Sequence, residues 1–414
     1  MQVPQEIADC VIDETVDDIL TLRHCSLVCR GWRSTAQHQL FNSIEVDVSQ
    51  RPLPTFVEFF SSSLDASDAD LRAPVSLYVR HLTVRSAGKN NPNADIITID
   101  NLHEILHCFP RLRTLTLEAL RIELDATQLP QNPHPLARVS LKDVIVQDRT
   151  HDQLLRALTA LCAPRALHLS NVGLKTDTDP EAGPAAASQT VETLALRVRA
   201  MPPSFLRMFA RGGALRRLDV ACFVPGDVRA LAGFLEAAGG RLEHFALDLS
   251  RFLAKVPTSY EEDLRRVALD GCTSLRELTL RITFLAEPWA SLPFNGTGLD
   301  VASRILASAP PTLRTLTVAL ALDGDASSED AFYRPLEESF NTRLSWLKGL
   351  RAARPELREL RWIWSYARKV GKPRTTPVDP ILQAKLTKLV RENLAEVDAK
   401  GILRFVDGDE DIWG

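Results

Sequence analysis

Three residues in the first third of the sequence have the types and spacing of a metal site. His103, Glu104 and His107 belong to the run His-Glu-Ile-Leu-His. On a helix, this spacing places two imidazoles one turn apart, where they can hold Zn²⁺ while the glutamate acts as general base in peptide hydrolysis. A zinc peptidase is therefore one function that the sequence allows, and metal analysis of the purified protein would test it.

The helix that would carry this motif also has a structural use. Its apolar side chains recur at helical spacing and form one stripe: Leu102, Ile105, Leu106 and Phe109. Burying that stripe turns His103 and His107 toward solvent, and the helix ends at Pro110 without a further wall for an active site. We therefore expect a structural helix here, with no metal and no cofactor.

Cysteines offer a second possible metal site. Cys25 and Cys29 are four residues apart on one predicted helix, but no second pair with ligand spacing accompanies them, so packed thiols are favoured over zinc. The chain has seven cysteines, and most occupy apolar positions such as Cys108, Cys162 and Cys272. We expect reduced thiols in a cytoplasmic or nuclear protein.

Composition and charge argue against several classes of protein. Of the 414 residues, 45% are hydrophobic and 25% are charged, as in ordinary globular proteins. The net charge of -4 argues against a nucleic-acid binder, and no run approaches the roughly 18 apolar residues of a membrane span. The first residues also lack the pattern of a signal peptide. Since no phosphate loop, catalytic triad or carboxylate pair stands out, we predict a protein that is not an enzyme and binds neither nucleic acid nor membrane.

A short apolar pattern recurs from residue 41 onward. Apolar residues at positions i, i+3 and i+5 first occur as Phe41, Ile44 and Val46, and the pattern returns ten times. Its middle residues are Ile44, Leu82, Leu115, Val139, Leu167, Leu194, Leu218, Phe245, Leu278, Leu316 and Leu360. Between Leu82 and Leu278 these marker residues lie 24 to 33 positions apart, which is the period of leucine-rich repeats with insertions.

Segments with helical periodicity lie between the markers. They span residues 101–109, 152–161, 204–211, 227–238, 260–269 and 299–309. A strand-turn-helix unit cannot bury its apolar face alone, so neighbouring units must stack. The predicted fold is α/β, an irregular leucine-rich-repeat solenoid of horseshoe shape with a parallel sheet. Asn171 and Cys222 stand where an asparagine ladder would bond the turn backbone, and helices at 331–353 and 381–396 would cap the far end.

These patterns divide the chain into three parts. Residues 1–40 form a helical module, 41–366 the solenoid, and 367–414 a loop, a capping helix and an acidic tail. Trp362 and Trp364 favour core packing over a ligand site, and the basic run 368–374 favours a solvated loop. Insertions rich in Asp, Pro, Gly, Ser or Asn predict loops at residues 61–73, 87–93, 125–135, 175–188 and 323–330.

The strands also predict a surface for recognition. Residues between the buried positions should point to the concave side of the sheet, because side chains alternate along a strand. They form a shallow lane of mixed charge, which suits an extended protein ligand better than a small molecule. The candidate target-binding residues are Thr116, Ser140, His168, Arg197, Asp219, Asp248, Arg281 and Arg361. The insertion loops are the alternative surface.

The first forty residues have more apolar surface than a module of their size can bury. They predict two or three short amphipathic helices. One apolar stripe comprises Ile7, Val11 and Ile12, and a second comprises Cys25, Cys29, Trp32, Ala36 and Leu40. About forty residues is the lower limit for an independently stable domain, so these faces should dock on the rest of the chain or on another protein.

This stretch resembles the F-box. Pro4, Glu6 and Ile7 correspond to the family's opening proline and first helix, and the run Cys-Ser-Leu-Val-Cys-Arg-Gly-Trp, from Cys25 to Trp32, corresponds to its second half. The sequence of this stretch most resembles the F-box proteins of mushroom-type (basidiomycete) fungi. The resemblance implies binding to a Skp-type adaptor, and through it to a cullin. The residues that would bind the adaptor or support the binding helices are Pro4, Ile7, Val11, Leu22, Leu27, Val28 and Trp32.

Combined with a repeat array, the resemblance implies a substrate-recognition subunit of a Skp/cullin/F-box ubiquitin ligase. Such a subunit holds a protein target, here unknown, and needs no catalytic residue of its own. The alternative hypothesis is a leucine-rich-repeat scaffold without ligase function, whose N-terminal helices only cap the solenoid.

Overall fold

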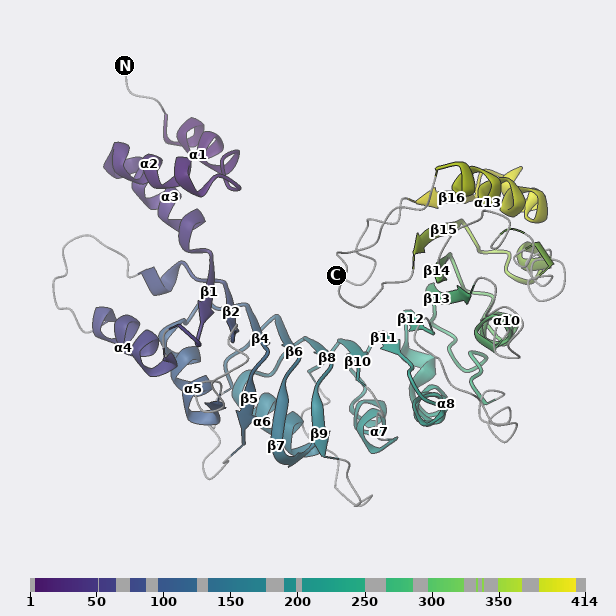
Figure 1. The fold of residues 1–414 in the computed structure, drawn as a ribbon, viewed down its shortest axis with the longest axis horizontal. Helices are drawn as coiled ribbons and strands as arrows, with labels where there is room; N and C mark the ends of the chain where they lie inside the picture. The colour runs from purple at the N-terminus through teal and green to yellow at the C-terminus, as the bar shows by residue number, and fades with distance from the viewer. Residues whose placement is uncertain are drawn as a thin grey trace. The chain divides into compact units, whose positions relative to one another are not determined.

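The computed structural model covers most of the chain (Figure 1). It describes residues 4–50, 52–64, 75–86, 96–124, 133–175, 190–198, 203–249, 266–285, 297–323, 333, 337–338, 349–366 and 380–406. The chain divides into two compact units, Met1–Val191 and Glu192–Gly414. Both units are built from parallel strands that alternate with helices, which is the leucine-rich-repeat architecture that the spacing of the markers predicts.

Unit 1 begins with three helices and continues as stacked coils. Its helical segments are α1 (Gln5–Asp13), α2 (Ile19–Val28), α3 (Arg30–Phe41), α4 (Leu53–Leu64), the 3-10 turn η1 (Val75–Leu77), α5 (Ile99–Cys108) and α6 (His151–Cys162). Its main sheet has the order β1 (Ser43–Asp47), β2 (His81–Arg85), β4 (Thr114–Glu118), β6 (Arg138–Lys142) and β8 (Ala166–Ser170). All neighbouring strands in this order are parallel.

The marker residues of unit 1 align across the sheet. Ile44 lies opposite Leu82, Leu82 opposite Leu115, Leu115 opposite Val139, and Val139 opposite Leu167. From Leu82 onward all of these side chains are buried. Burying one such side chain contributes about 1.5–3 kcal/mol, so stacking the coils creates the core that one coil lacks. The predicted strands of this unit are confirmed.

The coils of unit 1 turn through left-handed residues after the strands. Ala119, Asp143 and Asn171 have φ values of 55°, 53° and 52°. The N–H groups of Ala119 and Asp143 donate to the carbonyls of Lys142 and Ser170 on the next coil, both at 2.9 Å. The Asn171 side chain does connect two coils, but through the Asp143 carboxylate (2.6 Å), so the prediction that it bonds the turn backbone is wrong.

A second, smaller sheet follows these turns, and the sequence patterns do not predict it. Its parallel strands have the order β3 (Ile96–Thr98), β5 (Arg121–Glu123), β7 (Ile145–Thr150) and β9 (Gly173–Lys175). Three of the four have only three residues, which is too short for a period-2 pattern to be recognisable.

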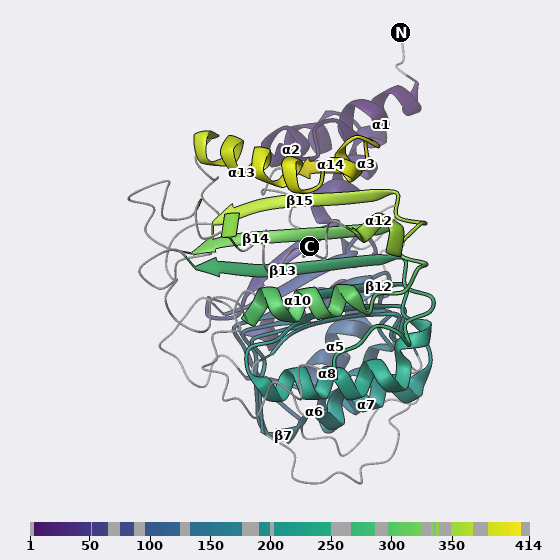
Figure 2. The same ribbon diagram turned by 90° about the vertical axis from the view of Figure 1, so that its right-hand side faces the viewer.

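Unit 2 repeats the scheme with longer strands. Its main sheet has the order β10 (Thr193–Arg197), β11 (Arg217–Ala221), β12 (His244–Asp248), β13 (Glu277–Leu285), β14 (Thr315–Asp323), β15 (Glu359–Tyr366) and β16 (Leu403–Val406). The helical segments are α7 (Pro203–Gly212), α8 (Pro225–Ala238), η3 (Gly239–Arg241), α10 (Thr297–Ala307), α12 (Leu350–Ala353), α13 (Pro380–Asn393) and α14 (Ala395–Asp398). Figure 2 shows β13, β14 and β15 side by side, with α10 packed next to them.

The markers of unit 2 align in the same way. The opposed residues are, in order, Leu194, Leu218, Phe245, Leu278, Leu316, Leu360 and Leu403. Leu403 belongs to β16, which extends the sheet inside the segment 367–414 and is not predicted from the sequence. Trp362 and Trp364 are buried with their rings 5.6 Å apart, as core packing predicts.

The structure differs from the sequence patterns at a few other places. Ser61–Leu64, predicted as the start of a loop, is the last turn of α4. Residues 266–269, predicted as helical, are not helical. The predicted helix 381–396 is present as α13 and α14, whereas only fragments of 331–353, including α12, are described. The remaining predicted loops, the basic run 368–374 and the acidic tail fall largely or wholly outside the described residues.

Candidate docking site on the N-terminal helices

A small core fixes the relative positions of helices α1, α2 and α3. Ile12, Leu22, Cys25 and Ala36 are buried together, and Trp32 and Leu40 pack against them. Each helix therefore contributes at least one side chain to this core. The core is small because it must close with only a few residues from each helix.

Side-chain hydrogen bonds join α1 to α3 outside this core. The Thr35 hydroxyl donates to Asp9 Oδ1 at 2.5 Å, and the Gln39 amide donates to Asp13 Oδ1 at 2.7 Å. The Gln5 amide donates to the Gly31 carbonyl at 3.2 Å. These contacts, spaced along α1, hold one face of the helix against α3 and leave another face free.

Helix α2 begins at a strong cap. The Asp18 carboxylate accepts hydrogen bonds from the backbone N–H groups of Leu20 (3.0 Å) and Thr21 (3.1 Å) and from the Thr21 hydroxyl (2.6 Å). The Thr21 hydroxyl bond, followed by the backbone bonds, lowers the pKa of Asp18 below its usual 3.8. The cap fixes where α2 starts and therefore which of its residues face outward.

Large apolar side chains are exposed on this module to an unusual degree. Among the described residues, eleven large hydrophobic side chains are exposed, and seven of them lie between Ile7 and Val28. The seven are Ile7, Val11, Val16, Ile19, Leu20, Leu27 and Val28. Leu27 is 77% exposed, the highest fraction in this group. A cluster of exposed apolar side chains within 22 residues is typical of a binding surface.

Helix α2 is apolar on two sides. Leu22 and Cys25 face the core, whereas Leu20 and Leu27 are seven residues, or two turns, apart on the other side. An ordinary surface helix has polar residues on its outer face, and a helix that is apolar all round is normally buried. Helix α2 therefore has the composition of a helix that is covered on both sides.

Helix α1 shows the same division in a weaker form. Ala8 and Ile12, one turn apart, are buried, and Ile7 and Val11, also one turn apart, are 55% and 48% exposed. The predicted stripe of Ile7, Val11 and Ile12 thus separates into two faces, because Ile12 belongs to the inner one.

The residues predicted to bind an adaptor take two structural positions. Pro4, Ile7, Val11, Leu27 and Val28 are exposed, so they are accessible to a partner. Leu22 is only 1% exposed and Trp32 is partly buried, so both support the helices from inside. Adaptor contact itself stays a prediction for all seven residues.

Three further exposed residues belong to the same surface and were not predicted: Val16, Ile19 and Leu20. Ile19 and Leu20 follow the Asp18 cap directly. An aspartate before an apolar run is a signal for a helix start, so this signal could have included them in the candidate set.

The cysteines of this module do not lie on one helix as predicted. Cys29 has an extended backbone, with φ −158° and ψ 171°, and separates α2 from α3. Cys25 is buried and Cys29 is exposed, so the one-turn spacing that a metal pair needs is lost. All seven cysteines are free, and Cys108, Cys162 and Cys272 are buried as predicted.

The His-Glu-Ile-Leu-His run lies on α5, and its orientation is the one predicted from the apolar stripe. Leu102, Ile105, Leu106 and Phe109 are buried, and His103, Glu104 and His107 are exposed. Within the described part of the chain, no group of three or more His, Cys, Asp or Glu residues is placed to hold a metal ion. The motif is thus a solvated face of a repeat helix.

The predicted lane lines up across the strands of each unit. In unit 1, Thr116 lies opposite Ser140, and Ser140 opposite His168. In unit 2, Asp219 belongs to a cross-strand row with Ala195, Ala246, Thr279, Thr317 and Arg361. The register therefore confirms that these residues share a line, whereas contact with a target stays a prediction.

Burial narrows the part of the lane that a partner can reach. Ser140, Asp219, Asp248 and Thr317 are all at most 9% exposed, whereas a lane that binds a target needs side chains within reach of a partner. Burial raises the pKa of Asp219, and the Arg217 guanidinium, 3.3 Å away, opposes the shift. Arg281 lies 4.0 Å from Asp248. Of the candidate residues, Arg361 is exposed, and Thr116, His168, Arg197 and Arg281 are partly exposed.

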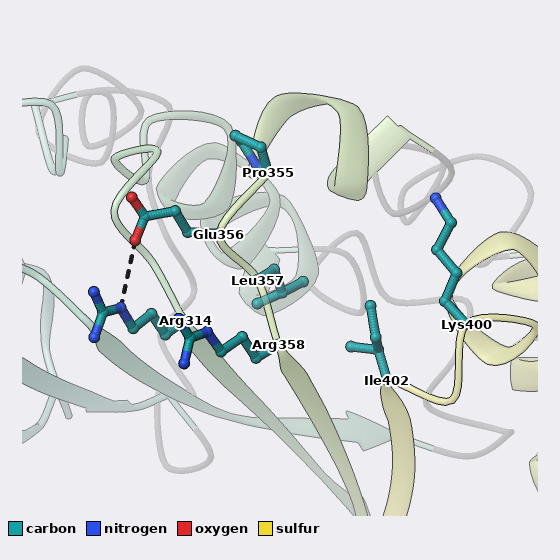
Figure 3. Close-up of a pocket in the computed structure, with 7 residues that line it drawn as sticks. All are labelled: Arg314, Pro355, Glu356, Leu357, Arg358, Lys400 and Ile402. Carbon is teal, nitrogen blue, oxygen red and sulfur yellow. Dashed lines mark hydrogen bonds and ion pairs between the residues drawn. The ribbon is translucent and has the colours of Figure 1, made fainter.

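A hollow in the described part of unit 2 lies where strands begin (Figure 3). It has a volume of about 720 Å³ and is lined by Arg314, Pro355, Glu356, Leu357, Arg358, Lys400 and Ile402. Arg314 and Glu356 form an ion pair at 3.4 Å, and Lys400 pairs with Glu396 at 3.6 Å.

Comparisons with known proteins were made by sequence and by structure. No family model and no curated protein matches the sequence. Among solved structures, the crystal structure of the Rad7 and Elc1 complex in yeast matches with a TM-score of 0.32 and 13% identity, covering 89% of this chain and 91% of that chain. The TLR13–ssRNA13 complex matches with a TM-score of 0.22 and 12% identity, covering 70% and 59%.

Scores this low do not establish a shared fold in detail, so the repeat architecture rests on the strand order and register of the chain itself. No helix in the described residues has both the length and the apolar character that a bilayer crossing requires. The structure thus shows a repeat protein with an exposed apolar surface on its first helices.

Proposed function

We propose that this protein is the substrate-recognition subunit of a Skp/cullin/F-box ubiquitin ligase. The observation that carries the proposal is the outer face of α2, where Leu20, Leu27 and Val28 are more than 60% exposed next to a closed core. Leu27 and Val28 fall within the run from Cys25 to Trp32 that resembles the F-box, and Leu20 lies in the same forty-residue stretch, so the motif and the unexplained apolar surface overlap.

A Skp-type adaptor would cover this apolar surface. The exposed side chains sit on short helices held rigidly by the core and the α1–α3 hydrogen bonds. A surface whose backbone is already folded loses less conformational entropy on binding than a segment that must fold first. The cullin would then be reached through the adaptor.

The mechanism would be positional. With the helices on the adaptor and the repeat coils on a target, the target's lysines stay near the charged conjugating enzyme. Holding two reactants together raises their effective concentration, and no catalytic residue is required in this chain. We propose the exposed members of the predicted lane, Arg361 among them, or the insertion loops as the target-binding surface.

The alternative role of the N-terminal helices, as a cap for the repeats, uses a different face. The ring centroids of His38 on α3 and Tyr78 are 6.1 Å apart. The Asn42 carbonyl accepts hydrogen bonds from the backbone N–H groups of Arg80 and His81. These contacts do join the helices to the coils. They leave the seven exposed apolar side chains without a role, and this favours the docking proposal over capping alone.

The experiment is a binding titration with a purified Skp-type adaptor. Val28→Asp places a charge where a partner would exclude water, and we expect it to weaken binding by about 2 kcal/mol or more, roughly 30-fold. Ile381→Asp on α13 is the matched control, because Val28 and Ile381 are both 61% exposed. Wild-type protein that does not bind, under conditions where an established F-box protein does, would exclude the proposal.

A further inference from the structure

A second surface of unit 1 is marked by charge. Arg80, Arg113 and Arg165 each occupy the position directly before a strand, namely β2, β4 and β8. Arg138 is the first residue of β6, and Arg111 lies two residues before Arg113. We call these five residues the basic edge. They occupy one end of four neighbouring parallel strands, because parallel strands all begin at the same side of a sheet.

Backbone hydrogen bonds bring the basic edge together. The N–H of Arg113 donates to the Arg80 carbonyl at 2.8 Å, and the N–H of Arg138 donates to the Arg113 carbonyl at 3.0 Å. The N–H of Arg165 donates to the Leu136 carbonyl, two residues before Arg138, at 3.2 Å. The arginines are therefore stacked from coil to coil at the strand spacing of about 4.8 Å.

These charges are not neutralised within the chain. None of the five guanidinium groups has an ion pair or a side-chain hydrogen bond in the described structure, and all except the half-buried Arg80 are exposed. The residues that lead into these strands, 78–81, 111–114, 135–138 and 163–166, include no aspartate or glutamate. At the same repeat position in unit 2, Arg216 pairs with Glu243 and Arg314 with Glu356, whereas Arg276 and Arg358 have no ion pair in the described structure.

The pKa values of two neighbouring histidines are lowered in part by the positive charge of these arginines. The pKa of His81 is lowered, first by burial and then by the charges of Arg80, Arg113 and Arg138. Burial and the charge of Arg80 also lower the pKa of His38, and Asp13 partly opposes this. That carboxylate already accepts a hydrogen bond from Gln39.

Helix ends explain part of the preference for arginine but not all of it. The repeat helices α5 and α6 end shortly before Arg111 and Arg165, and a cation near a helix C-terminus is stabilising by about 0.3–1 kcal/mol. One cation near each of these two helix ends would account for two of the five arginines and not for the other three. Five unpaired guanidinium groups side by side repel one another, so they are tolerated at a net cost unless an anionic partner binds.

We propose that the basic edge of unit 1 binds a short acidic segment of a protein. Three strand intervals span about 14 Å, which an extended segment of about four or five residues would cover. Guanidinium groups bind carboxylates through paired hydrogen bonds. Of the described phenylalanine, tyrosine and tryptophan side chains, Tyr78 and Phe109 are the nearest in sequence to the row. The Tyr78 ring is packed against His38 and Phe109 is buried, so neither is a platform for stacking nucleic-acid bases.

The basic edge adjoins the N-terminal helices. Helix α3 leads directly into β1, and the Asn42 carbonyl between them accepts hydrogen bonds from the backbone N–H groups of Arg80 and His81, both at 2.9 Å. If the N-terminal helices hold an adaptor, as proposed above, the acidic segment belongs to the target. The assignment of the acidic segment to the target rests on the proposed function. The binding of an acidic segment to the basic edge does not depend on it.

The test uses the full chain and a fluorescein-labelled peptide of ten glutamates, measured by fluorescence anisotropy. A glutamine peptide of equal length and a ten-nucleotide single-stranded oligothymidylate are the comparison probes. We expect the glutamate peptide alone to bind, at least about fivefold more weakly when salt is raised from about 50 to about 300 mM, since salt screens exposed charges.

Charge reversal localises the binding. Arg113→Glu/Arg138→Glu should weaken glutamate-peptide binding at least about tenfold. Arg121→Glu is the matched control, because Arg121 is exposed and unpaired on β5, in the other sheet of unit 1. Urea unfolding of each variant, with an unchanged midpoint, excludes loss of the fold.

Two results would overturn the proposal: unchanged peptide binding by the double variant, or tighter binding of the oligonucleotide that the same substitutions abolish. The adaptor titration is run in parallel on the same variants. Because Arg113→Glu/Arg138→Glu leaves α2 intact, it should retain adaptor binding, so failure of the ligase proposal and failure of the acidic-segment proposal give different patterns.

Discussion

Helices α2 and α5 have the same length, ten residues, and similar amounts of apolar sequence, but they distribute it differently. In α5 the apolar residues face the repeat core, and His103, Glu104 and His107 face solvent. In α2, Leu22 and Cys25 face the core while Leu20, Leu27 and Val28 face outward. The repeat core covers the apolar face of α5, whereas α2 has the sequence of a helix that is covered on two sides.

The difference teaches where to look for function in a repeat protein. Stacked coils satisfy their own apolar faces, so an exposed apolar side chain on a repeat helix is an exception. The N-terminal helices have no stacked neighbour on their outer side. Exposing apolar surface to water is unfavourable, and this surface is not needed for folding, so it indicates a binding site.

The largest expected difference is in stability, between a variant with a charge on the inner face of α5 and one with a charge on the outer face of α2. Leu106→Asp buries an unpaired carboxylate, because Leu106 is 4% exposed, and it should cost unit 1 more than about 4 kcal/mol. Leu27→Asp should change stability by no more than about 0.5 kcal/mol. Urea unfolding measures both, and similar losses for the two variants would contradict the comparison.

Truncating Leu27 should affect binding rather than folding. Leu27→Ala removes the most exposed of these apolar side chains and should weaken adaptor binding by about 1–3 kcal/mol, roughly 5- to 150-fold, if it lies at the centre of the interface. Ile145→Ala is the control, since Ile145 is 53% exposed but lies on a repeat strand. Isothermal titration calorimetry distinguishes the two, and equal affinities would remove Leu27 from the interface.

The Asp18 cap should give a smaller, pH-dependent effect. Its folded pKa lies below 3.8, so the charged cap stabilises the module above that pH and loses its contribution as pH falls through the folded pKa. Asp18→Ala should lower the Tm at pH 7, and Asp18→Asn should lower it less, because asparagine also caps. The difference in Tm between wild type and Asp18→Asn should disappear in acid. A difference that persists there would show that the carboxylate charge does not matter.

The repeat strands could be predicted because their pattern is strict. The i, i+3, i+5 spacing places one apolar side chain at the same height in every coil, and the observed register matches it from Ile44 to Leu167 and from Leu194 to Leu360. Leu403 escapes this pattern because β16 follows two helices and is only four residues long. The three-residue strands of the second sheet give even less signal.

The docking site could be predicted in part. The apolar stripes identified the helices, but periodicity alone does not say which stripe faces inward, and Ile12 and Val11 are on different faces. The break at Cys29 was missed because no proline marks it, and the nearby Gly31 lies inside α3 and not at the break. The basic edge was missed because its arginines are far apart in sequence, and only the stacked coils bring them together.

The smallest effect is expected at the outer face of α5. Glu104→Gln and His107→Ala alter exposed side chains, so each should leave stability within about 0.5 kcal/mol of wild type and leave adaptor binding unchanged. A zinc peptidase would need His107 as a zinc ligand and Glu104 as general base, and the purified protein would then carry about one zinc per chain. We expect less than about 0.1 zinc per chain by plasma emission analysis, with no change on substitution. Stoichiometric zinc that His107→Ala removes would mean that α5, like α2, has an outer face with a function of its own.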